Sequence, residues 1–417
     1  MTAKVPPLRE GGRRGDVAKR RRLRQRILIL FLIAMTIPYA RQIAISPTVG
    51  QDFRAFFAAA TVLAEHGSPY DWPTLARVEE QLYDAPADLR PGDPAFYEFL
   101  AYPEGPWLAY ALVPLTHLPW QEAYAVYATL LLIILLIASF ALFGMLGWDR
   151  GRRSIGVVCT ALSAIGFINV FMGQVSIVVF AAFIAAWWLA RRSHGWWAGL
   201  VLALIWLKPN IGLPLPIIVA LLEPSVARRL IAGFIAASAV AFGAAALLLG
   251  FAFLDWPLQI PRMWQAVQGI QPDMASIESF FYPGLAGISK TAALILTLAV
   301  ALGYGAWSLR RAADPWSRGL TLLLVWLTAL PFVQSYDMIL LLPVVLVLLG
   351  PRLEGGSSSL LELTIWTFLT LPLCYFLGLR IGYFNGFTAI PVALLLLAWH
   401  RQRILPWPAT LAPARAA

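Results

Sequence analysis

Residues 121–146 read QEAYAVYATLLLIILLIASFALFGML, an apolar run that contains a single charged residue, Glu122. About 20 such residues in a helix span the ~30 Å of hydrocarbon in a bilayer. Similar runs recur along most of the 417 residues, of which 59% are hydrophobic and 13% charged, whereas soluble proteins have about a quarter charged. The runs are continuous rather than alternating, which favours helices over a barrel. The sequence therefore predicts an all-α, polytopic integral membrane protein.

Charged clusters between the runs predict the topology. Residues 1–26 contain ten Lys or Arg and two acidic residues, a net charge of +8, which is typical of a cytoplasmic arm before a first span. Such an arm rests on anionic lipids more readily than on DNA, so we expect no nucleic-acid partner. With every strong basic cluster inside, the chain crosses about twelve times. The expected spans are 27–45, 121–146, 155–170, 174–190, the bent and possible re-entrant pair 196–207 and 211–222, 229–250, 291–309, 316–333, 335–350, 361–379 and 386–400.

These spans form one membrane domain, residues 27–403, followed by a cytoplasmic tail, residues 404–417. The domain has two long outer loops, 46–120 and 251–290. The first loop has ten acidic residues against three Arg, the reverse of a cytoplasmic loop. Periodic apolar positions predict helices over 53–63 and 73–83 that lie on the membrane surface.

Asp52 opens the first outer loop, just beyond the first span. Two interpretations stand side by side. An Asp at this position can be the N-cap of the helix that starts near Phe53. It can also be the general base of a transferase that takes its substrate from the membrane.

Polar residues at membrane depth are costly and need a reason. Lys208 precedes Pro209, which breaks a helix, so its ammonium could bind a phosphate there or simply reach toward the interface. Asn169 and Gln174 flank a turn and could serve that turn or face a polar cavity. Asp337 begins a span and could cap the helix or face a substrate.

Several familiar chemistries have no motif in the sequence. It contains no Asp-x-Asp pair in a soluble segment, no phosphate-binding glycine loop, no His-x-x-x-His pair and no Gly-x-Ser-x-Gly elbow. We therefore expect neither ATP hydrolysis, nor a metal site, nor a cofactor.

The polar and proline-rich segments occur in a recognisable order. They are Asp52, Gly67-Ser68-Pro69-Tyr70-Asp71, Tyr102-Pro103-Glu104-Gly105-Pro106, Pro114-Leu115 with Leu118-Pro119, Asn169 with Gly173-Gln174, Lys208-Pro209-Asn210, and Ser335-Tyr336-Asp337. Over roughly residues 27–350 this order resembles glycosyltransferase family 87 of the GT-C superfamily. It is similar to the mycobacterial mannosyltransferases that extend phosphatidylinositol mannosides. The chain departs from them at Glu104, where members often have Pro, and at 335–337, which replaces a His-containing segment.

The resemblance implies a GT-C-type bundle in the plasma (inner) membrane with its active site on the extracytoplasmic side. It implies a metal-free, inverting transfer of a mannose-like hexose from a polyprenyl-phosphate-sugar to a glycolipid or glycan of the cell envelope. The family's catalytic Asp maps onto Asp52. Because the freed phosphate needs a cation rather than an acid, Lys208 is the candidate for it and Arg262 a weaker one. Candidate substrate contacts are Tyr102, Glu104, Asn169, Gln174, Asn210, Tyr336 and Asp337.

Two other classes of function remain as alternatives. A transporter or flippase of lipid-linked sugars predicts internal repeats and intramembrane acid–base pairs, neither of which the sequence indicates. A non-catalytic membrane subunit would need neither Asp52 nor Lys208.

Overall fold

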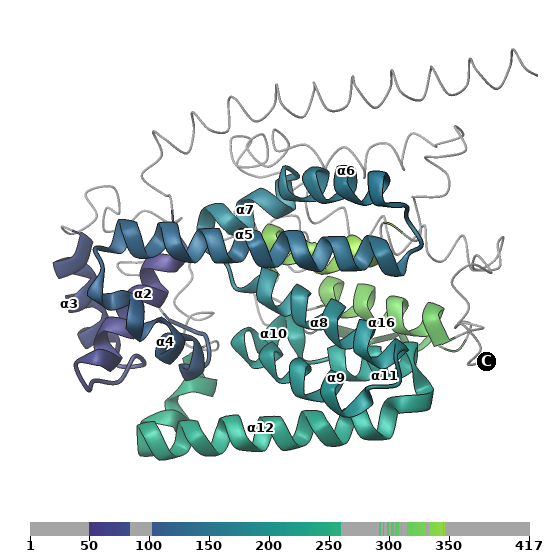
Figure 1. The fold of residues 1–417 in the computed structure, drawn as a ribbon. Coiled ribbons are helices and arrows are strands. Elements are labelled where there is room, and N and C mark those ends of the chain that lie inside the picture. Colours follow the sequence, from purple (N-terminus) through teal and green to yellow (C-terminus); the bar gives the residue numbers. More distant parts are fainter. Residues whose placement is uncertain are drawn as a thin grey trace, which may run out of the picture. The chain divides into compact units, whose positions relative to one another are not determined.

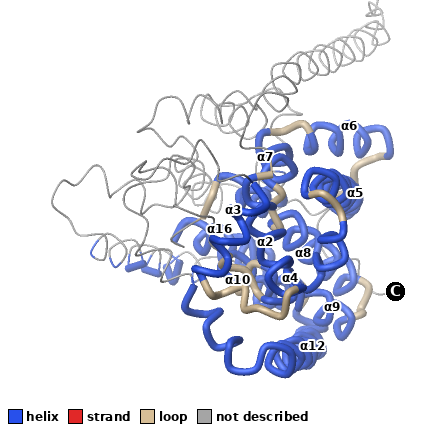
Figure 2. Tube along the Cα trace, turned by 90° about the vertical axis from the view of Figure 1, so that its left-hand side faces the viewer, coloured by secondary structure: helices blue, strands red, loops and turns tan. Residues whose placement is uncertain are grey.

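The computed structural model describes residues 50–83, 102–259, 315–329 and 333–344, with residue 346 and isolated positions between 292 and 310. Every element in these ranges is a helix, and Figure 2 shows them joined by loops with no strand. The all-α class is therefore confirmed. The expected spans 27–45, 361–379 and 386–400, and most of the second outer loop with Arg262, lie outside the described residues.

The described helices follow one another closely along the chain. The first group is α2 (Gln51–Ala64), α3 (Trp72–Tyr83), α4 (Pro106–Leu112), the 3₁₀ helix η1 (Val113–His117) and α5 (Trp120–Met145). The second is α6 (Arg150–Ala161), α7 (Ala164–Met172), α8 (Ser176–Arg191), α9 (Gly195–Leu202), η2 (Ala203–Leu207), α10 (Pro209–Gly212) and α11 (Leu215–Leu222). The last is η3 (Pro224–Val226), α12 (Ala227–Leu249), η4 (Gly250–Asp255), α16 (Pro315–Ala329) and η5 (Ser335–Leu341).

Two of the described helices are long and apolar enough to cross a membrane. They are Trp120–Met145 and the helical stretch Pro224–Gln259, which match the predicted spans 121–146 and 229–250. Large apolar side chains on both point outward, including Ile137, which is 65% exposed, and Leu247, which is 88% exposed. Such surface suits lipid rather than water, so the structure agrees with a membrane protein.

The expected span 155–170 is not one straight helix. It is divided into α6 and α7, which meet at an angle of 52°. Ser163 starts α7 as its N-cap, with its hydroxyl accepting a hydrogen bond of 3.0 Å from Gly166 N. The cap begins a new helix within the apolar run, so this pair is either a broken span or a re-entrant segment.

The helices pack in a connected series. α5 contacts α8, α8 contacts α9, and α9 contacts α12, as can be followed in Figure 1. α9 and α12 approach closely at Gly199 and Gly233, where an added Cβ would meet backbone atoms of the facing helix. α2 packs on α3, α4 and η1 near the start of α5.

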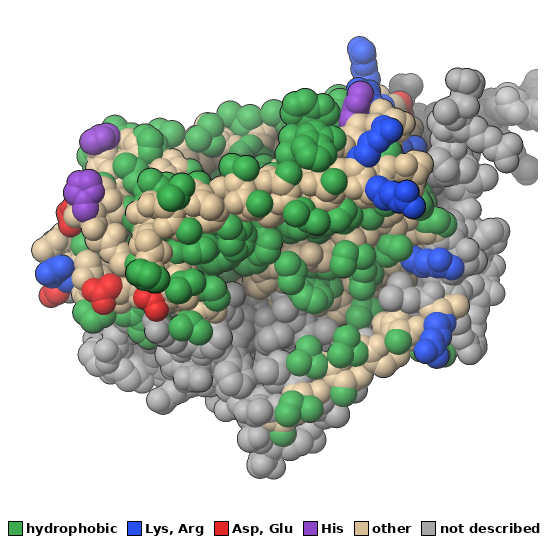
Figure 3. All heavy atoms as spheres, turned by 90° about the horizontal axis from the view of Figure 1, so that it is seen from below, with side chains coloured by type: hydrophobic (Ala, Val, Ile, Leu, Met, Phe, Trp, Pro, Cys, Tyr) green, Lys and Arg blue, Asp and Glu red, His purple; other side chains and the backbone are tan. Residues whose placement is uncertain are grey.

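Charge is distributed unevenly along this bundle. Exposed Arg150, Arg192, Arg228 and Arg229 lie where α6 and α12 begin and α8 ends. Figure 3 shows most Lys and Arg at one end of the face and Asp and Glu at the other, with apolar side chains between. This face of the bundle therefore has a basic end and an acidic end.

Candidate active site

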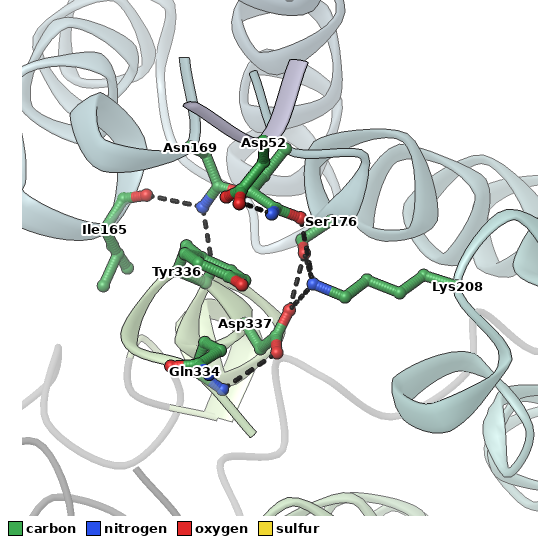
Figure 4. Close-up of polar contacts among 9 residues, drawn as sticks. Asp52, Ile165, Asn169, Ser176, Lys208, Gln334, Tyr336 and Asp337 are labelled. Atoms are coloured by element: carbon green, nitrogen blue, oxygen red, sulfur yellow. Dashed lines mark hydrogen bonds and ion pairs between the residues drawn. The ribbon is translucent and has the colours of Figure 1, made fainter. Parts of the chain in front are cut away.

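The candidate general base, Asp52, lies in the first turn of α2. Gly50 holds the N-cap position with a φ of 66°, a backbone conformation that favours glycine, and no side chain caps the helix. The interpretation of Asp52 as the N-cap is therefore wrong. Its Oδ2 instead accepts a hydrogen bond of 2.5 Å from Nε2 of Gln174, which comes from the turn before α8 (Figure 4).

The turn between α7 and α8 places Gln174 against α2. Gly173 ends α7 with a φ of 77°, and the amide of Gln174 donates to the carbonyl of Asn169 at 2.8 Å. A Cβ on Gly173 would lie 2.6 Å from the Cβ of Phe53. Glycine therefore provides both the turn and the close approach that brings Gln174 to the carboxylate.

Lys208 lies at the break between η2 and α10, and it is 7% exposed. Its Nζ donates to Gln174 Oε1 at 3.0 Å and to Ser176 Oγ at 3.1 Å. A third bond, 2.8 Å long, goes to Asp337 Oδ1, and the ammonium lies 4.3 Å from the ring centre of Tyr336. An ammonium has three N–H groups, and each has an acceptor here. The alternative of a lysine that reaches toward the interface is therefore wrong.

Of the two roles that the sequence left open for Asp337, the structure shows the helix cap, and contact with a substrate stays a prediction. Its Oδ2 accepts a hydrogen bond of 3.0 Å from Gln334 N in the capping box of η5. Its Oδ1 accepts from Lys208 and, at 2.6 Å, from the hydroxyl of Ser176. Asp337 is fully buried. Its carboxylate stabilises the first turn of η5 and neutralises the buried ammonium of Lys208.

Asn169 fastens α7 to η5. Its Nδ2 donates to the carbonyl of Ile165 and to that of Tyr336, both at 2.7 Å. The second bond connects residues 167 positions apart and holds η5 against α7 (Figure 4). Hydrogen bonds thus connect Asp52 with three other chain segments, which carry Gln174, Lys208 and Asp337.

Glu104 is the second carboxyl near Asp52. It is 6% exposed, and its backbone is held by the hydroxyl of Tyr70, which donates to Glu104 O at 3.1 Å. The neighbouring Tyr102 hydroxyl serves the same loop, donating to Gly105 O at 2.6 Å and accepting from Ala109 N at 3.1 Å.

The carboxyls of Asp52 and Glu104 have different pKa values. Burial raises the pKa of Asp52 to about 6, while the hydrogen bond from Gln174 and the charge of Lys208 lower it. Burial raises the pKa of Glu104 to about 8, against the lowering effect of Lys208, and the charge of Asp52 raises it further. These shifts favour an ionised Asp52 and a protonated Glu104 near neutral pH.

The other candidate residues relate in different ways to the cluster, which consists of Asp52, Gln174, Ser176, Lys208 and Asp337. Within the described residues no hydrogen bond joins the Asn210 side chain to the cluster, and the Asn210 carbonyl accepts from Trp326 Nε1 at 2.8 Å. Arg262 lies outside the described residues. The sequence analysis did not identify Ser176 or Tyr127 as site residues. The signals were the position of Ser176 two residues after Gln174 and the phenol of Tyr127 within the apolar run 121–146. In the described ranges no group of three or more His, Cys, Asp or Glu could hold a metal ion.

The ion pair between Lys208 and Asp337 corrects one expectation. The sequence indicated no intramembrane acid–base pair, and the structure contains a buried pair of this kind. Because these residues are 129 positions apart, no local pattern could have shown the pair.

The comparison with known proteins gives one match. The sequence model of glycosyltransferase family 87 matches residues 99–335, which is more than half of the chain. The match includes Glu104, Gln174 and Lys208, whereas Asp52 precedes it and Asp337 follows it. No curated protein and no solved structure matches the chain.

Proposed function

This chain belongs to glycosyltransferase family 87, and we propose that it transfers a mannose-like hexose from a polyprenyl-phosphate-sugar to a glycolipid or glycan acceptor, with inversion. The observation that carries this proposal is the half-buried carboxylate of Asp52, which is held by Gln174, whose amide is in turn held by Lys208. An oriented carboxylate with a pKa of about 6 can remove a proton near neutral pH.

The proposed step needs one base and one anion-stabilising group. The acceptor hydroxyl oxygen attacks C1 of the donor sugar while Asp52 takes the hydroxyl proton. The bond between C1 and the phosphate oxygen breaks, and its electron pair leaves with the polyprenyl phosphate. The phosphate is a stable leaving group, so no acid is required for its departure. The proton remains on Asp52 until it is lost to solvent.

Lys208 is the proposed contact for the donor phosphate. All three of its N–H groups have acceptors, so a phosphate oxygen has to replace one of them. Ser176 Oγ and Gln174 Oε1 are the neutral acceptors and are easier to displace than the carboxylate of Asp337. Arg262 remains a second proposed cation. The proposed substrate contacts are Tyr102, Glu104, Asn169, Gln174, Asn210, Tyr336 and Asp337.

We also propose that the site faces the extracytoplasmic side of the plasma membrane, in a GT-C-type bundle of about twelve spans. Ser176 and Arg191 are the first and last residues of α8. At 1.5 Å per residue they are roughly 22 Å apart. The cluster around Asp52 is therefore most of a bilayer away from the basic end of the bundle, and basic ends face the cytoplasm.

The alternative function is transport of lipid-linked sugars. The buried pair of Lys208 and Asp337 is what an ion-coupled transporter would also contain. Membership of a glycosyltransferase family, together with a base-like carboxylate outside the pair, favours transfer.

Mass spectrometry of envelope glycolipids and glycans tests this proposal. Cells that lack the chain should lose one species and accumulate its precursor, which is smaller by one hexose. Unchanged glycolipids and glycans in cells without the chain would contradict the proposed function.

A further inference from the structure

Glu104 presents a buried polar atom that the protein itself does not use. In the described part of the chain its Oε2 has no hydrogen-bond partner. The loop around it is fixed by the hydroxyls of Tyr70 and Tyr102, which bond to backbone atoms. The loop thus has other hydrogen bonds that hold it, and an unpaired buried carboxyl oxygen requires another explanation.

Tyr127 presents a second such atom. It is 7% exposed, its ring stacks on Phe53 with centroids 4.9 Å apart, and its hydroxyl has no partner among the described residues. Its neighbour Tyr124, three residues earlier on α5, donates to backbone carbonyls at 2.9 and 3.1 Å. Phenylalanine would fill the position of Tyr127 without leaving a buried hydroxyl unpaired.

The unpaired Glu104 Oε2 and Tyr127 hydroxyl lie in the same region of the structure. The Tyr127 hydroxyl interacts electrostatically with the carboxyls of both Glu104 and Asp52. Glu104 interacts with Asp52 and with Lys208. Because the Tyr127 ring also stacks on Phe53, the residue after Asp52, the unpaired Tyr127 hydroxyl and Glu104 Oε2 lie near the proposed base.

We propose that Glu104 and Tyr127 form a subsite that binds hydroxyl groups of a sugar next to Asp52. This inference rests on the proposed function. A phenol and a carboxylic acid each supply one donor and one acceptor, as adjacent sugar hydroxyls require. Because burial raises the pKa of Glu104 to about 8, the acid carries its proton at neutral pH and can donate. The sugar belongs either to the donor or to the acceptor, and the two sources are separable by experiment.

The first test is the thermal stability of two Tyr-to-Phe variants of the full chain in detergent. Tyr127→Phe removes an unpaired hydroxyl, so its Tm should equal or exceed that of the wild type. Tyr124→Phe is the matched control on the same helix, and its Tm should fall because the hydrogen bonds from its hydroxyl to the carbonyls of Val170 and Phe171 are lost. A fall in Tm for Tyr127→Phe as large as that for Tyr124→Phe would show a structural bond and overturn the proposal.

The second test measures sugar binding. The donor probes are polyprenyl-phosphate-mannose and the sugar-free polyprenyl phosphate, and the acceptor is the lipid extract of cells that lack the protein. If the subsite holds the donor sugar, Tyr127→Phe raises the KM for polyprenyl-phosphate-mannose roughly 10-fold and leaves the affinity for polyprenyl phosphate unchanged. If it holds the acceptor sugar, only the KM for the acceptor rises. Unchanged KM values for both substrates would overturn the subsite.

The pH dependence of KM in the Glu104→Gln variant distinguishes sugar binding by Glu104 from a structural role. Glutamine stays neutral at every pH, whereas wild-type Glu104 loses its donor proton as the pH rises through about 8. The wild-type KM for the bound sugar should therefore rise above pH 8, and that of Glu104→Gln should not. The same rise in both proteins would contradict the assignment. A wild-type protein that transfers no sugar would instead refute the proposed function, and the stability comparison would still decide whether the Tyr127 hydroxyl is structural.

Discussion

Replacing Asp52 with Asn separates catalysis from stability, because the two should change in opposite directions. Asn has nearly the same shape, and its carbonyl can still accept the hydrogen bond from Gln174. It cannot take a proton, so turnover should fall on the order of 10²–10⁴-fold, or about 3–5 kcal/mol of activation free energy. Expression and donor binding should remain normal.

The expected gain in stability follows from the pKa of Asp52. Burial raises this pKa from the ordinary 3.8 to about 6. Ionisation is therefore harder in the folded state, and the folded state loses stability as the pH rises from about 4 through about 6. At pH 7 a shift of about 2 units corresponds to about 3 kcal/mol, which Asp52→Asn should recover in part. A capping residue would instead lose about 1 kcal/mol.

The assay pairs two measurements on one preparation of purified protein. Thermal unfolding in detergent should show an unchanged or higher Tm for Asp52→Asn, and proteoliposomes supplied with polyprenyl-phosphate-mannose should show the loss of turnover. Asp52→Glu should recover little, because one methylene displaces the carboxylate from the acceptor hydroxyl. Transfer by Asp52→Asn at near the wild-type rate would refute the role of base.

Further predictions concern the partners of the base and the topology. Gln174→Ala removes a hydrogen bond that lowers the pKa of Asp52, so the acidic limb of the kcat–pH profile should move to higher pH; an unmoved limb would show that Gln174 does not act on the base. Lys208→Ala should weaken binding of polyprenyl-phosphate-mannose and lower stability by about 3–5 kcal/mol, because it leaves a buried carboxylate unpaired. Lys208→Arg should retain part of the binding, and unchanged donor affinity in the alanine variant would remove Lys208 from the phosphate site. A cysteine at Ser68 should react with an impermeant label from outside and one at Ser193 should not; the reverse pattern would refute the topology.

The apolar runs predicted the long helices well, because a continuous run of the right length has few other uses. α5 begins and ends within a residue of the predicted span 121–146. The run at 155–170 forms two helices rather than one, because the hydroxyl of Ser163 caps a new helix within it. Local composition does not show whether a serine lies within a continuous helix or caps the start of a new one.

Much of the candidate site could also be predicted, since polar residues at membrane depth are conspicuous. The sequence singled out Gln174, Lys208 and Asp337, and the structure brings their side chains together. Their connections could not be predicted, because Gln174 is 122 residues from Asp52 and 34 from Lys208. The cap interpretation of Asp52 fails because Gly50 holds the N-cap position, and the role of base stays a proposal.

Reconstituted proteoliposomes test the central claim most directly. They contain the purified chain, polyprenyl-phosphate-mannose and the lipid extract of cells that lack the protein, and mass spectrometry follows both substrates. Transfer predicts that an extract lipid gains one hexose while an equal amount of polyprenyl phosphate is released, and that Asp52→Asn abolishes both changes. Movement of intact polyprenyl-phosphate-mannose across the bilayer without a glycosylated product would contradict the account and identify a transporter.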